Sequence, residues 1–488
     1  MRIICVSVIW MLCVSCSSGP RLKPLDVPSD ALAQAMQDPC TSITPSEKNI
    51  QADWWQLFHD NQLNEFIETA LLRNPTLVTA QATIYKSLAN ADLLKSDLYP
   101  SLLWAGDISK QKLSQTGIIP FNSMPPGLSD ASFPPIVVPP GQTQIPVYFT
   151  QYETELNLHW DFDIWGKRRS LYRAALGEVW AKMADKAFLR LGLAIAVAKT
   201  YYQLQIDYAR LKNARNLVAN LREYENLVIK RLQGNIETRQ SLNTSIYNLT
   251  NAKQLLLQIE GDIAVHLHQL MAYLADGFDE CIDPVPIHPD CLPQIPLPCD
   301  LPVNLLARRP DIAAQLALIS SAGWQIESAK AGFYPDFSLT AIYGYQTVFW
   351  SKLFQKPSTF YNIDPAFSLP IFDGGRLVAN LRDSEFNYDL AISQYNEMVL
   401  NAVKEVLDGI SVLCNLEKQY NNVHDSFNQQ NQVYQLTARK MSNNLSSGLD
   451  TLSAEANVLV ARDQELAILG KKIDAMLDLI KALGGGYE

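Results

Sequence analysis

Basic tracts, glycine and long apolar runs are all scarce in this 488-residue chain, and each scarcity excludes a class of protein. The net charge is −10 and no run of Lys and Arg stands out, which argues against a nucleic-acid partner. Only 22 glycines are present, and neither a P-loop nor a dinucleotide-binding Gly motif occurs. Beyond the N-terminus, no apolar run approaches the roughly 18–20 residues that a membrane helix needs. A membrane role would therefore require β-strands or a covalent lipid.

Catalytic and metal-binding motifs are missing as well. The six histidines form no metal motif, and His266 and His268 stand two residues apart, so they do not share a helix face. Neither HExxH nor GxSxG occurs. We therefore predict that the chain is not an enzyme, that it holds no metal, and that it carries no cofactor other than a lipid.

Four cysteines, Cys40, Cys281, Cys291 and Cys299, are expected to form disulfides. No CxxC spacing occurs after residue 16, and His288 is the only histidine near the last three, so zinc is a poor alternative. The bacterial periplasm is oxidising, and four cysteines can make two bridges there. The sequence leaves their connectivity open.

The N-terminus has the pattern of a secretion signal. Met1 and Arg2 form a short basic region, and the apolar stretch that follows has signal-peptide length. The segment Cys13-Val14-Ser15-Cys16 then resembles a bacterial lipobox, which implies a lipid on Cys16 and anchoring at the outer membrane. We expect a signal peptide over residues 1–15 and a lipid-anchored segment over 16–59. The alternative is an ordinary cleaved secretory signal.

The remainder of the chain contains an internal sequence repeat. Pro75 and Pro100 in the first half correspond to Pro310 and Pro335 in the second, and the two pairs have the same spacing. We therefore divide the chain into a first repeat (60–276), a Pro/Cys-rich connector (277–302) and a second repeat (303–488). A function shared by two copies of one unit is expected to come from shape rather than from a single catalytic cluster.

The stretch Tyr148–Ile164 alternates strictly between apolar and polar residues, as a β-strand with two unlike faces does. Aromatic and aliphatic residues share one face. The acids Glu153, Glu155, Asp161 and Asp163 share the other. An apolar outer face and an acidic inner face are typical of a membrane barrel with a wet lumen. The alternative is one long strand of a soluble sheet.

Similar alternation predicts three more strands, so that each half supplies a hairpin: Ser101–Leu113, Phe337–Tyr345 and Tyr361–Leu369. Four strands cannot close a membrane barrel, because the smallest barrels have about eight. An open edge in lipid would leave backbone groups unpaired. The chain must therefore oligomerise if these strands span a bilayer, and two, three or four copies would each give an even strand count.

Two very long helices are predicted, from Ser170 to about Gln233 and from Leu377 to about Ser442. Each would be on the order of 95–100 Å long at 1.5 Å per residue. Shorter helices are expected at about 60–98 and 240–276 in the first half and at about 303–333 and 450–483 in the second. Stacked end to end, the two short helices of each half have roughly the length of its long helix. This arithmetic predicts a tall helical cylinder. A soluble coiled coil would explain the helices, but not the strand hairpins between them.

Five ordered motifs resemble the outer membrane factor family, and most closely its lipoprotein branch of TolC-, OprM- and NodT-like channels. The motifs are Trp54–Leu63, Phe162–Arg169, Ala307–Ile312, Ala331–Pro335 and Pro370–Arg376. The resemblance implies a mixed fold, in which a homotrimer forms a twelve-stranded membrane β-barrel above a long α-helical barrel in the periplasm. It also implies a periplasmic adaptor and an inner-membrane pump as partners, with drugs or other small molecules as cargo.

Other functions stay open at this point. The channel could serve type I protein secretion. Alternatively, the chain could be a periplasmic coiled-coil scaffold or adaptor lipoprotein without a pore, or a surface protein that binds through its Pro-rich loop at 120–140. The long alternating strand favours the channel over both non-pore alternatives.

The resemblance also implies a gate at the periplasmic entrance, where family members carry acidic residues. Asp450 matches one of these acids, whereas Ser453 stands where the next one is expected, so the acidic ring would be weaker here. Carboxylates brought together by a symmetry axis repel one another or bind cations. The alternative for Asp450 is an ordinary acid at a helix start, stabilised by the helix dipole.

Overall fold

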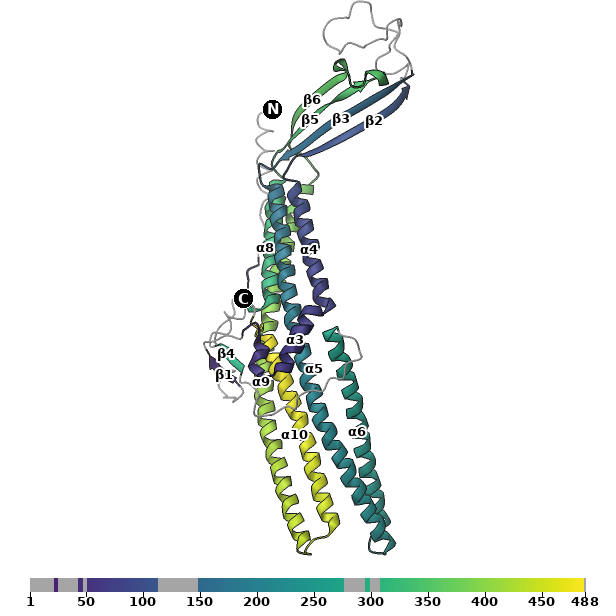
Figure 1. The fold of residues 1–488 in the computed structure, drawn as a ribbon. Coiled ribbons are helices and arrows are strands. Elements are labelled where there is room, and N and C mark those ends of the chain that lie inside the picture. The colour runs from purple at the N-terminus through teal and green to yellow at the C-terminus, as the bar shows by residue number, and fades with distance from the viewer. Residues whose placement is uncertain are drawn as a thin grey trace, which may run out of the picture. The chain divides into compact units, whose positions relative to one another are not determined.

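The computed structural model describes residues 22–24, 43–46, 51–112, 148–275, 295–298 and 308–486 (Figure 1). The chain forms two compact units, and each takes segments from both sequence halves. The sheet unit comprises Ala89–Ala175 and Gly323–Glu385. The helical unit comprises Met1–Leu88, Leu176–Ala322 and Phe386–Glu488. The compact units therefore cut across the two repeats in the sequence.

The sheet unit contains one antiparallel sheet in the order β2-β3-β5-β6, with strands β2 (Ser101–Lys112), β3 (Tyr148–Phe162), β5 (Asp336–Thr347) and β6 (Thr359–Ser368). All four predicted strands are present. Strand β3 of the first half pairs with β5 of the second, and Phe162 lies opposite Phe337. Two 3-10 turns, η3 (Trp350–Lys352) and η4 (Lys356–Ser358), connect β5 to β6.

Two helices of 67 residues each dominate the chain: α5 (Lys167–Gln233) and α9 (Arg376–Ser442). Both begin within three residues of their predicted starts. The shorter helices are α3 (Asn61–Arg73), α4 (Pro75–Ser96), α6 (Arg239–Leu274), α8 (Pro310–Ala331) and α10 (Gly448–Ala482). None of the helices in the described ranges has a segment both long and apolar enough to cross a bilayer.

The helix predicted over 60–98 is interrupted, which corrects the prediction. Asn74 takes an extended conformation between α3 and α4, because the ring of Pro75 excludes the helical conformation at the residue before it. The Asn74 side chain bonds to the start of α4 through Thr76 N (2.9 Å) and donates to the Tyr273 carbonyl at the end of α6 (2.9 Å). One residue thus starts α4 and holds the end of α6.

The second half uses the same joint with a different side chain. Arg309, which also precedes a proline, donates to the Ala482 carbonyl at the end of α10 (3.2 Å). Its guanidinium is nearly buried and also pairs with Asp311 (2.8 Å) and Glu405 (2.7 Å). A buried cation is tolerated only when it is paired in this way. Each half therefore links the end of one short helix to the start of the other at its X-Pro step.

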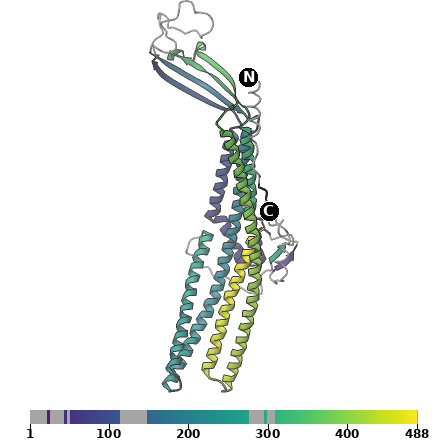
Figure 2. The same cartoon turned by 180° about the vertical axis from the view of Figure 1, so that it is seen from behind.

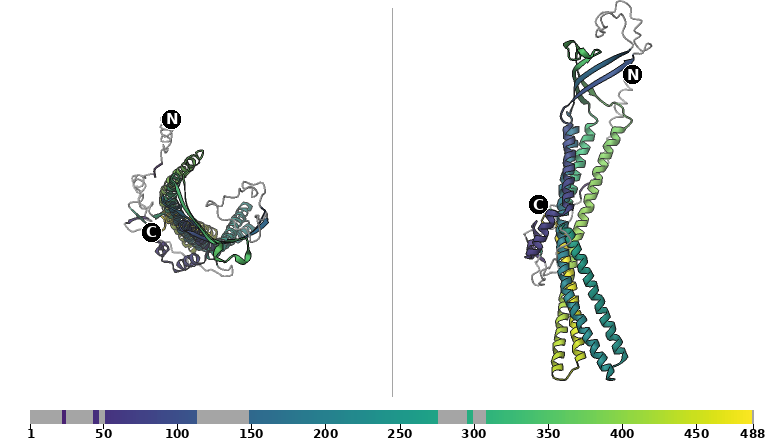
Figure 3. Two further views of the ribbon diagram at one scale, coloured as in Figure 1. Left: turned by 90° about the horizontal axis from the view of Figure 1, so that it is seen from above. Right: turned by 45° about the vertical axis from the view of Figure 1, so that its right-hand side comes forward.

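In the helical unit, α6, α5, α10 and α9 lie side by side in that order (Figures 2 and 3). Helices α5 and α10 join the two halves through two ion pairs, Arg210–Asp463 (2.9 Å) and Lys199–Asp478 (2.7 Å). Helix α8 approaches α5 closely at Gly177, where an added Cβ would lie 2.9 Å from the Ser321 Cβ. Small residues are therefore required at that crossing.

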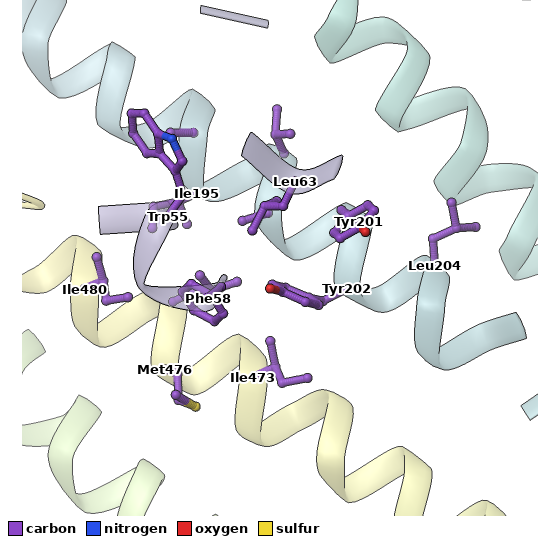
Figure 4. Packing of buried hydrophobic residues seen from close by; sticks show 14 of the residues in the cluster. Trp55, Phe58, Leu63, Ile195, Tyr201, Tyr202, Leu204, Ile473, Met476 and Ile480 are labelled. Carbon is purple, nitrogen blue, oxygen red and sulfur yellow. The ribbon is translucent and has the colours of Figure 1, made fainter. Parts of the chain in front are cut away.

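The largest hydrophobic cluster lies where the N-terminal segment meets α5 and α10 (Figure 4). The turn η1 (Trp54–Phe58) inserts its aromatic rings there, and the Phe58 ring contacts that of Tyr202 at a tilt of 38°, with ring centroids 5.4 Å apart. Tyr201 donates its hydroxyl to Asp60 (2.9 Å). A short parallel pair, β1 (Ile43–Ser46) and β4 (Ile295–Pro298), ties the N-terminal segment to the connector.

Candidate functional site: the faces of the sheet and the ends of the hairpins

The first candidate site is the sheet, because one of its faces is apolar and freely exposed. Trp104, Tyr361 and Phe367 on this face are each more than 70% exposed. The register places them with the other apolar side chains of the four strands: Leu102, Ile108, Tyr152, Leu156, Leu158, Trp160, Phe337, Leu339, Tyr343, Tyr345 and Ile363. An exposed apolar patch of this kind marks a surface that contacts lipid or protein.

The opposite face carries acids. Glu153 accepts hydrogen bonds from Gln151 Nε2 (2.8 Å) and Gln346 Nε2 (3.2 Å), and it lies opposite Asp107. Glu155 lies opposite Gly344, where an added Cβ would come within 2.8 Å of the Glu155 Cβ. Glycine at 344 therefore allows β5 to approach Thr154 and Glu155 of β3 closely. Glu153 and Glu155 thus share one polar face, as the alternation predicts, and their exposure to a lumen stays a prediction.

Two other predicted lumen acids are engaged near the start of α5. Asp161 lies on the polar face, forms an ion pair with Arg168, and has its carboxylate 3.4 Å from Nε2 of His159. Asp163 lies beyond the end of β3, so the prediction that the strand reaches Ile164 is wrong. The Asp163 carboxylate instead accepts from the backbone N–H of Arg168 and of Arg169, both at 2.9 Å.

The second half repeats this arrangement at Asp373. Its carboxylate accepts from the backbone N–H of Gly375 (3.0 Å) and Leu377 (2.8 Å) at the start of α9. The exposed N–H groups at a helix start need acceptors, and a carboxylate also interacts favourably with the helix dipole. Strand β3 therefore ends before the predicted Ile164, because Asp163 accepts hydrogen bonds from the first backbone N–H groups of α5.

Helices α5 and α6 form one helical hairpin, and α9 and α10 form another. The second candidate site comprises the turns of these two hairpins, which are called the hairpin ends. Asn235 and Asn444 both adopt a left-handed conformation, with φ of 60° and 59°. Each hairpin then places a hydroxyl N-cap before its second helix, Thr238 before α6 and Ser447 before α10. The two turns are built alike, but only the second has an acid at the third helical position, Asp450.

Asp450 forms a capping box with Ser447. Its carboxylate accepts from Ser447 N (2.9 Å), Ser447 Oγ (2.8 Å) and Ser446 Oγ (3.1 Å). These hydrogen bonds, and the nearby Arg231, hold the pKa of Asp450 below its ordinary value, so the carboxylate stays ionised in moderately acidic solution. Ser453 is exposed one turn further along α10. Asp450 therefore has a structural role in addition to its predicted gate role.

Two substitutions separate these roles of Asp450. We expect Asp450→Ala to destabilise the hairpin end by about 1 kcal/mol, because the carboxylate half of the capping box is lost while the Ser447 N-cap remains. Asp450→Asn keeps an oxygen acceptor but removes the charge, so we expect it to retain most of the stability and to change cation block of the channel. Thermal unfolding and single-channel recording in the presence of multivalent cations measure the two effects. Unchanged cation sensitivity in both variants would remove the gate assignment.

Two buried carboxylate–histidine pairs are not predicted above, because the histidines were assessed only as metal ligands. Asp207 on α5, with its side chain 1% exposed, bonds to Nδ1 of His266 on α6 (2.7 Å). Glu465 on α10, 3% exposed, bonds to Nδ1 of His424 on α9 (2.6 Å). Each hairpin is thus closed by one such pair. The hydrogen bond to Asp207 raises the pKa of His266 above its ordinary value.

This shift predicts a pH dependence of stability. Because the folded-state pKa of His266 is raised, its contribution is complete below the unfolded value of about 6.5 and is lost as the pH rises through the folded value. Asp207 of α5, Asp262 of α6 and Asp474 of α10 surround the imidazole and favour its charged form. We expect His266→Gln to cost about 1–3 kcal/mol at pH 6 and less in alkaline solution.

Thermal unfolding between pH 6 and 9 checks this expectation, with Asp207→Asn as the matched partner. The loss caused by His266→Gln should shrink in the Asp207→Asn background, because the charged acceptor is then absent. A loss that is constant across this range, or unaffected by Asp207→Asn, would contradict the assignment.

Two charged cavities lie beside this network, and both include Lys471 and Asp474 of α10. The first, of about 430 Å³, lies among α5, α6 and α10, where its other charged lining residues are Lys199, Arg210 and His266. The second, of about 500 Å³, lies along α9 and α10 and adds Glu405, Asp408, Asp478 and Lys481. Burial raises the pKa of Asp474. Within the described ranges, no three His, Cys, Asp or Glu side chains converge to hold a metal ion.

Several predicted sites fall outside the described residues. These are the signal peptide, the lipidation site Cys16, the Pro-rich loop at 120–140, and the four cysteines predicted to form disulfides, Cys40, Cys281, Cys291 and Cys299. They stay predictions.

A sheet with one apolar and one acidic face, together with helices of 67 residues, defines the class of channel proteins that combine a membrane β-barrel with an α-helical barrel. The chain belongs to the outer membrane efflux protein family, whose model matches residues 66–276 and 301–485. It is an efflux channel protein of the outer membrane. The predicted family, the fold class and the outer-membrane location are confirmed, whereas the lipid anchor and the number of copies in the channel stay predictions.

Similar proteins cover nearly the whole chain. The multidrug resistance outer membrane protein MdtP of Escherichia coli K12 is 28% identical over 445 residues, which are 90% of this chain and 87% of that protein. The putative multidrug resistance outer membrane protein MdtQ of the same strain is 30% identical over 448 residues, 89% and 88% of the two chains. The crystal structure of the outer membrane protein VceC from Vibrio cholerae has a TM-score of 0.75 at 28% identity, over 90% of this chain and all of that one.

Proposed function

We propose that the protein is the passive outer-membrane exit duct of a tripartite efflux system. In this system an inner-membrane pump drives small molecules or drugs through a periplasmic adaptor into a homotrimer of this chain. The observation that carries the proposal is the two-faced sheet, with large apolar side chains exposed on one side and Asp107, Glu153 and Glu155 on the other. Such a sheet suits a wall between lipid and water.

The two open edges of the sheet support a homo-oligomer, because a single copy cannot form a closed barrel. Among the described residues the sheet ends at β2 and β6, and each edge strand presents a row of backbone groups that no other described strand pairs. Lipid offers these groups no hydrogen bonds, so an edge must pair with another copy. Three copies of four strands would give twelve, within the range of known membrane barrels.

Association along the helices is consistent with the same assembly. Helices α6 and α9 are the outermost of the four helices that lie side by side, and both expose large apolar residues. Among these are Tyr247 and Leu257 on α6 and Leu400 and Leu436 on α9. Contact between α6 of one copy and α9 of the next would bury them. The hydrophobic gain from such burial is about 25 cal/mol per Å² of apolar surface.

The hairpin ends offer a docking surface for the adaptor. Ile236 and Leu445 occupy equivalent positions in the two turns and are 68% and 76% exposed. Apolar side chains held at rigid turns can anchor a partner with little loss of conformational freedom. Cargo in the drug class is supported by the two relatives, both of which are described as multidrug resistance proteins.

The duct is tested on the purified full-length protein and on a deletion strain. We expect heat-modifiable trimers in outer-membrane fractions, single-channel currents in planar bilayers, and increased drug susceptibility of the deletion strain. Pull-down with the hairpin ends intact should recover an adaptor, and Ile236→Asp with Leu445→Asp should abolish the recovery without loss of trimers. A water-soluble, non-conducting particle would refute the duct and favour a scaffold. Loss of a secreted protein without any change in drug susceptibility would favour type I secretion.

We also propose that Cys16 carries the lipid that anchors the mature N-terminus to the outer membrane. Its support is the resemblance of the segment ending at Cys16 to a lipobox. Mass spectrometry of the mature protein should find an acylated cysteine at residue 16, and Cys16→Ser should abolish the acyl mass. An unmodified N-terminus elsewhere would contradict the proposal.

A further inference from the structure

The apolar face of the sheet changes character along its length. On β2 it runs from Leu102 through Ile108 to Lys110 and Lys112, at the end remote from the helices. Lys112 lies opposite Tyr148, the first residue of β3, and both lysines are exposed. The apolar band is therefore bordered by cations where the strands reach the loops.

The β5–β6 connection adds two more lysines at the same rim. The ring of Trp350 contacts Tyr152 (centroids 5.3 Å apart), and Phe354 contacts Tyr345 (5.6 Å), so the connection folds against the apolar side of the sheet. Lys352 and Lys356 lie in η3 and η4 of this connection, and both are exposed. Lys110, Lys112, Lys352 and Lys356 are together named the rim lysines.

The rim lysines differ from the cations at the opposite end of the sheet in having no acidic partners. Near the helices, Lys167 pairs with Asp336 (3.1 Å) and Arg169 pairs with Asp163 (3.0 Å). Within the described residues, none of the rim lysines forms an ion pair. Lys112 lies over the ring of Tyr148 (5.4 Å) and Lys352 lies over the ring of Phe349 (5.1 Å). No acid among the described residues therefore neutralises their charges.

We infer that the rim lysines bind the phosphate groups of phosphorylated lipid in the outer leaflet. The inference rests on the proposed function, in which the apolar face contacts lipid, and it adds that the loop end of the sheet faces the cell exterior. A lysine beside an apolar surface extends its ammonium towards the polar boundary, where it can donate up to three hydrogen bonds to phosphate. The exposed ring of Trp350 suits the same interfacial depth.

The test uses the full-length protein in neutral detergent and a glycolipid with two phosphates, lipid A, beside its dephosphorylated form. Lipid retained per chain after gel filtration is quantified by mass spectrometry, and affinity is measured by titration. We expect at least tenfold weaker binding of lipid A when all four rim lysines are changed to Gln, and near-complete rescue when they are changed to Arg. Dephosphorylated lipid should bind the unmodified protein at least tenfold less tightly than lipid A.

The matched control changes four exposed lysines of the helical unit to Gln: Lys86, Lys212, Lys253 and Lys404. It should bind lipid A like the unmodified protein. If the fourfold rim variant does not assemble, the pairs Lys110→Gln with Lys112→Gln and Lys352→Gln with Lys356→Gln are tested separately, and each should lose part of the affinity.

Equal binding of lipid A by the rim variants and the unmodified protein would overturn the inference. Equal binding of the two lipids, or equal loss in the helical control, would also overturn it. Channel conductance of the same preparations keeps this outcome separate from the proposed function, because the duct can conduct whether or not the rim binds phosphate.

Discussion

Gly484→Ala should destabilise the protein by about 3–5 kcal/mol, a large loss for a change of one methyl group. Gly484, Gly485 and Gly486 all have positive φ, at 87°, 56° and 80°. An L-residue in that region costs roughly 1–2 kcal/mol before any contact is considered. A Cβ at Gly484 would also overlap the carbonyl oxygen of Arg308, which is backbone and cannot rotate away. The adjacent Arg309 holds the end of α10, so a shift there would disturb the joint between helices.

The three glycines should not be equivalent, because their neighbours differ. A Cβ at Gly486 would meet the backbone of Gln51 and Ala52, whereas one at Gly485 would meet the tip of the Leu191 side chain, which can move. We therefore expect Gly486→Ala to resemble Gly484→Ala and Gly485→Ala to cost less. Thermal and denaturant unfolding of the purified protein measure the series.

Two helical glycines provide the control. An added Cβ at Gly192 or Gly261 would have no atom within 4 Å, and both residues lie inside helices. Ala at either position should stabilise the protein by about 0.5–1 kcal/mol, because it restricts the unfolded chain. If Gly484→Ala behaved like these two variants, the C-terminal turn would not be under the steric constraint that we infer.

The periodic elements could be predicted from the sequence because their signals are local. The alternation of β3 and the uninterrupted helical pattern of α5 and α9 do not depend on any distant residue. The repeat of Pro75 and Pro100 at Pro310 and Pro335 then supplied the organisation of the chain. These features are confirmed in the four strands and the two 67-residue helices.

Errors occurred where a side chain serves a backbone group or a distant partner. The polar alternation continues through Asp163, but this carboxylate starts α5, so the strand ends at Phe162. The helical pattern continues through Asn74, yet the following proline forces an extended residue, and Asn74 then bonds to Tyr273, 199 residues away. The restriction that a proline places on the preceding residue predicts the helix break at Asn74. No residue near Asn74 in the sequence indicates that Tyr273 is its partner.

The buried charges are the least predictable part of the candidate site. Asp207 and His266 are 59 residues apart, and Glu465 and His424 are 41 apart, so neither pair forms a recognisable spacing. They become evident only when two helices of a hairpin are aligned. The same holds for Gly344, because an added Cβ would meet the Thr154 carbonyl oxygen and the Cα and Cβ of Glu155 on the neighbouring strand β3.

Ile363→Arg should prevent stable assembly of the channel in the outer membrane. Ile363 lies on the apolar face of β6 and is 65% exposed, so the substitution removes little packing within the chain. Any loss of stability caused by Ile363→Arg must therefore come from what surrounds the apolar face, not from packing within the chain. An arginine facing lipid at the middle of a bilayer costs about 2–4 kcal/mol in a membrane barrel. In a homotrimer the cost would apply to three copies at once.

Asn362→Arg is the matched control, because Asn362 is the preceding residue of the same strand, is also exposed, and points to the acidic face. A guanidinium there would be solvated in a water-filled lumen beside the acids of that face, so trimers should persist. Heat-modifiable trimer yield from outer-membrane fractions compares the two variants, and conductance then reports the change in lumen charge. If both substitutions reduced the trimer equally, or if Ile363→Arg were the milder one, the apolar face would not be the lipid-facing side. The proposed duct, which requires lipid on that face and water on the other, would then have to be abandoned.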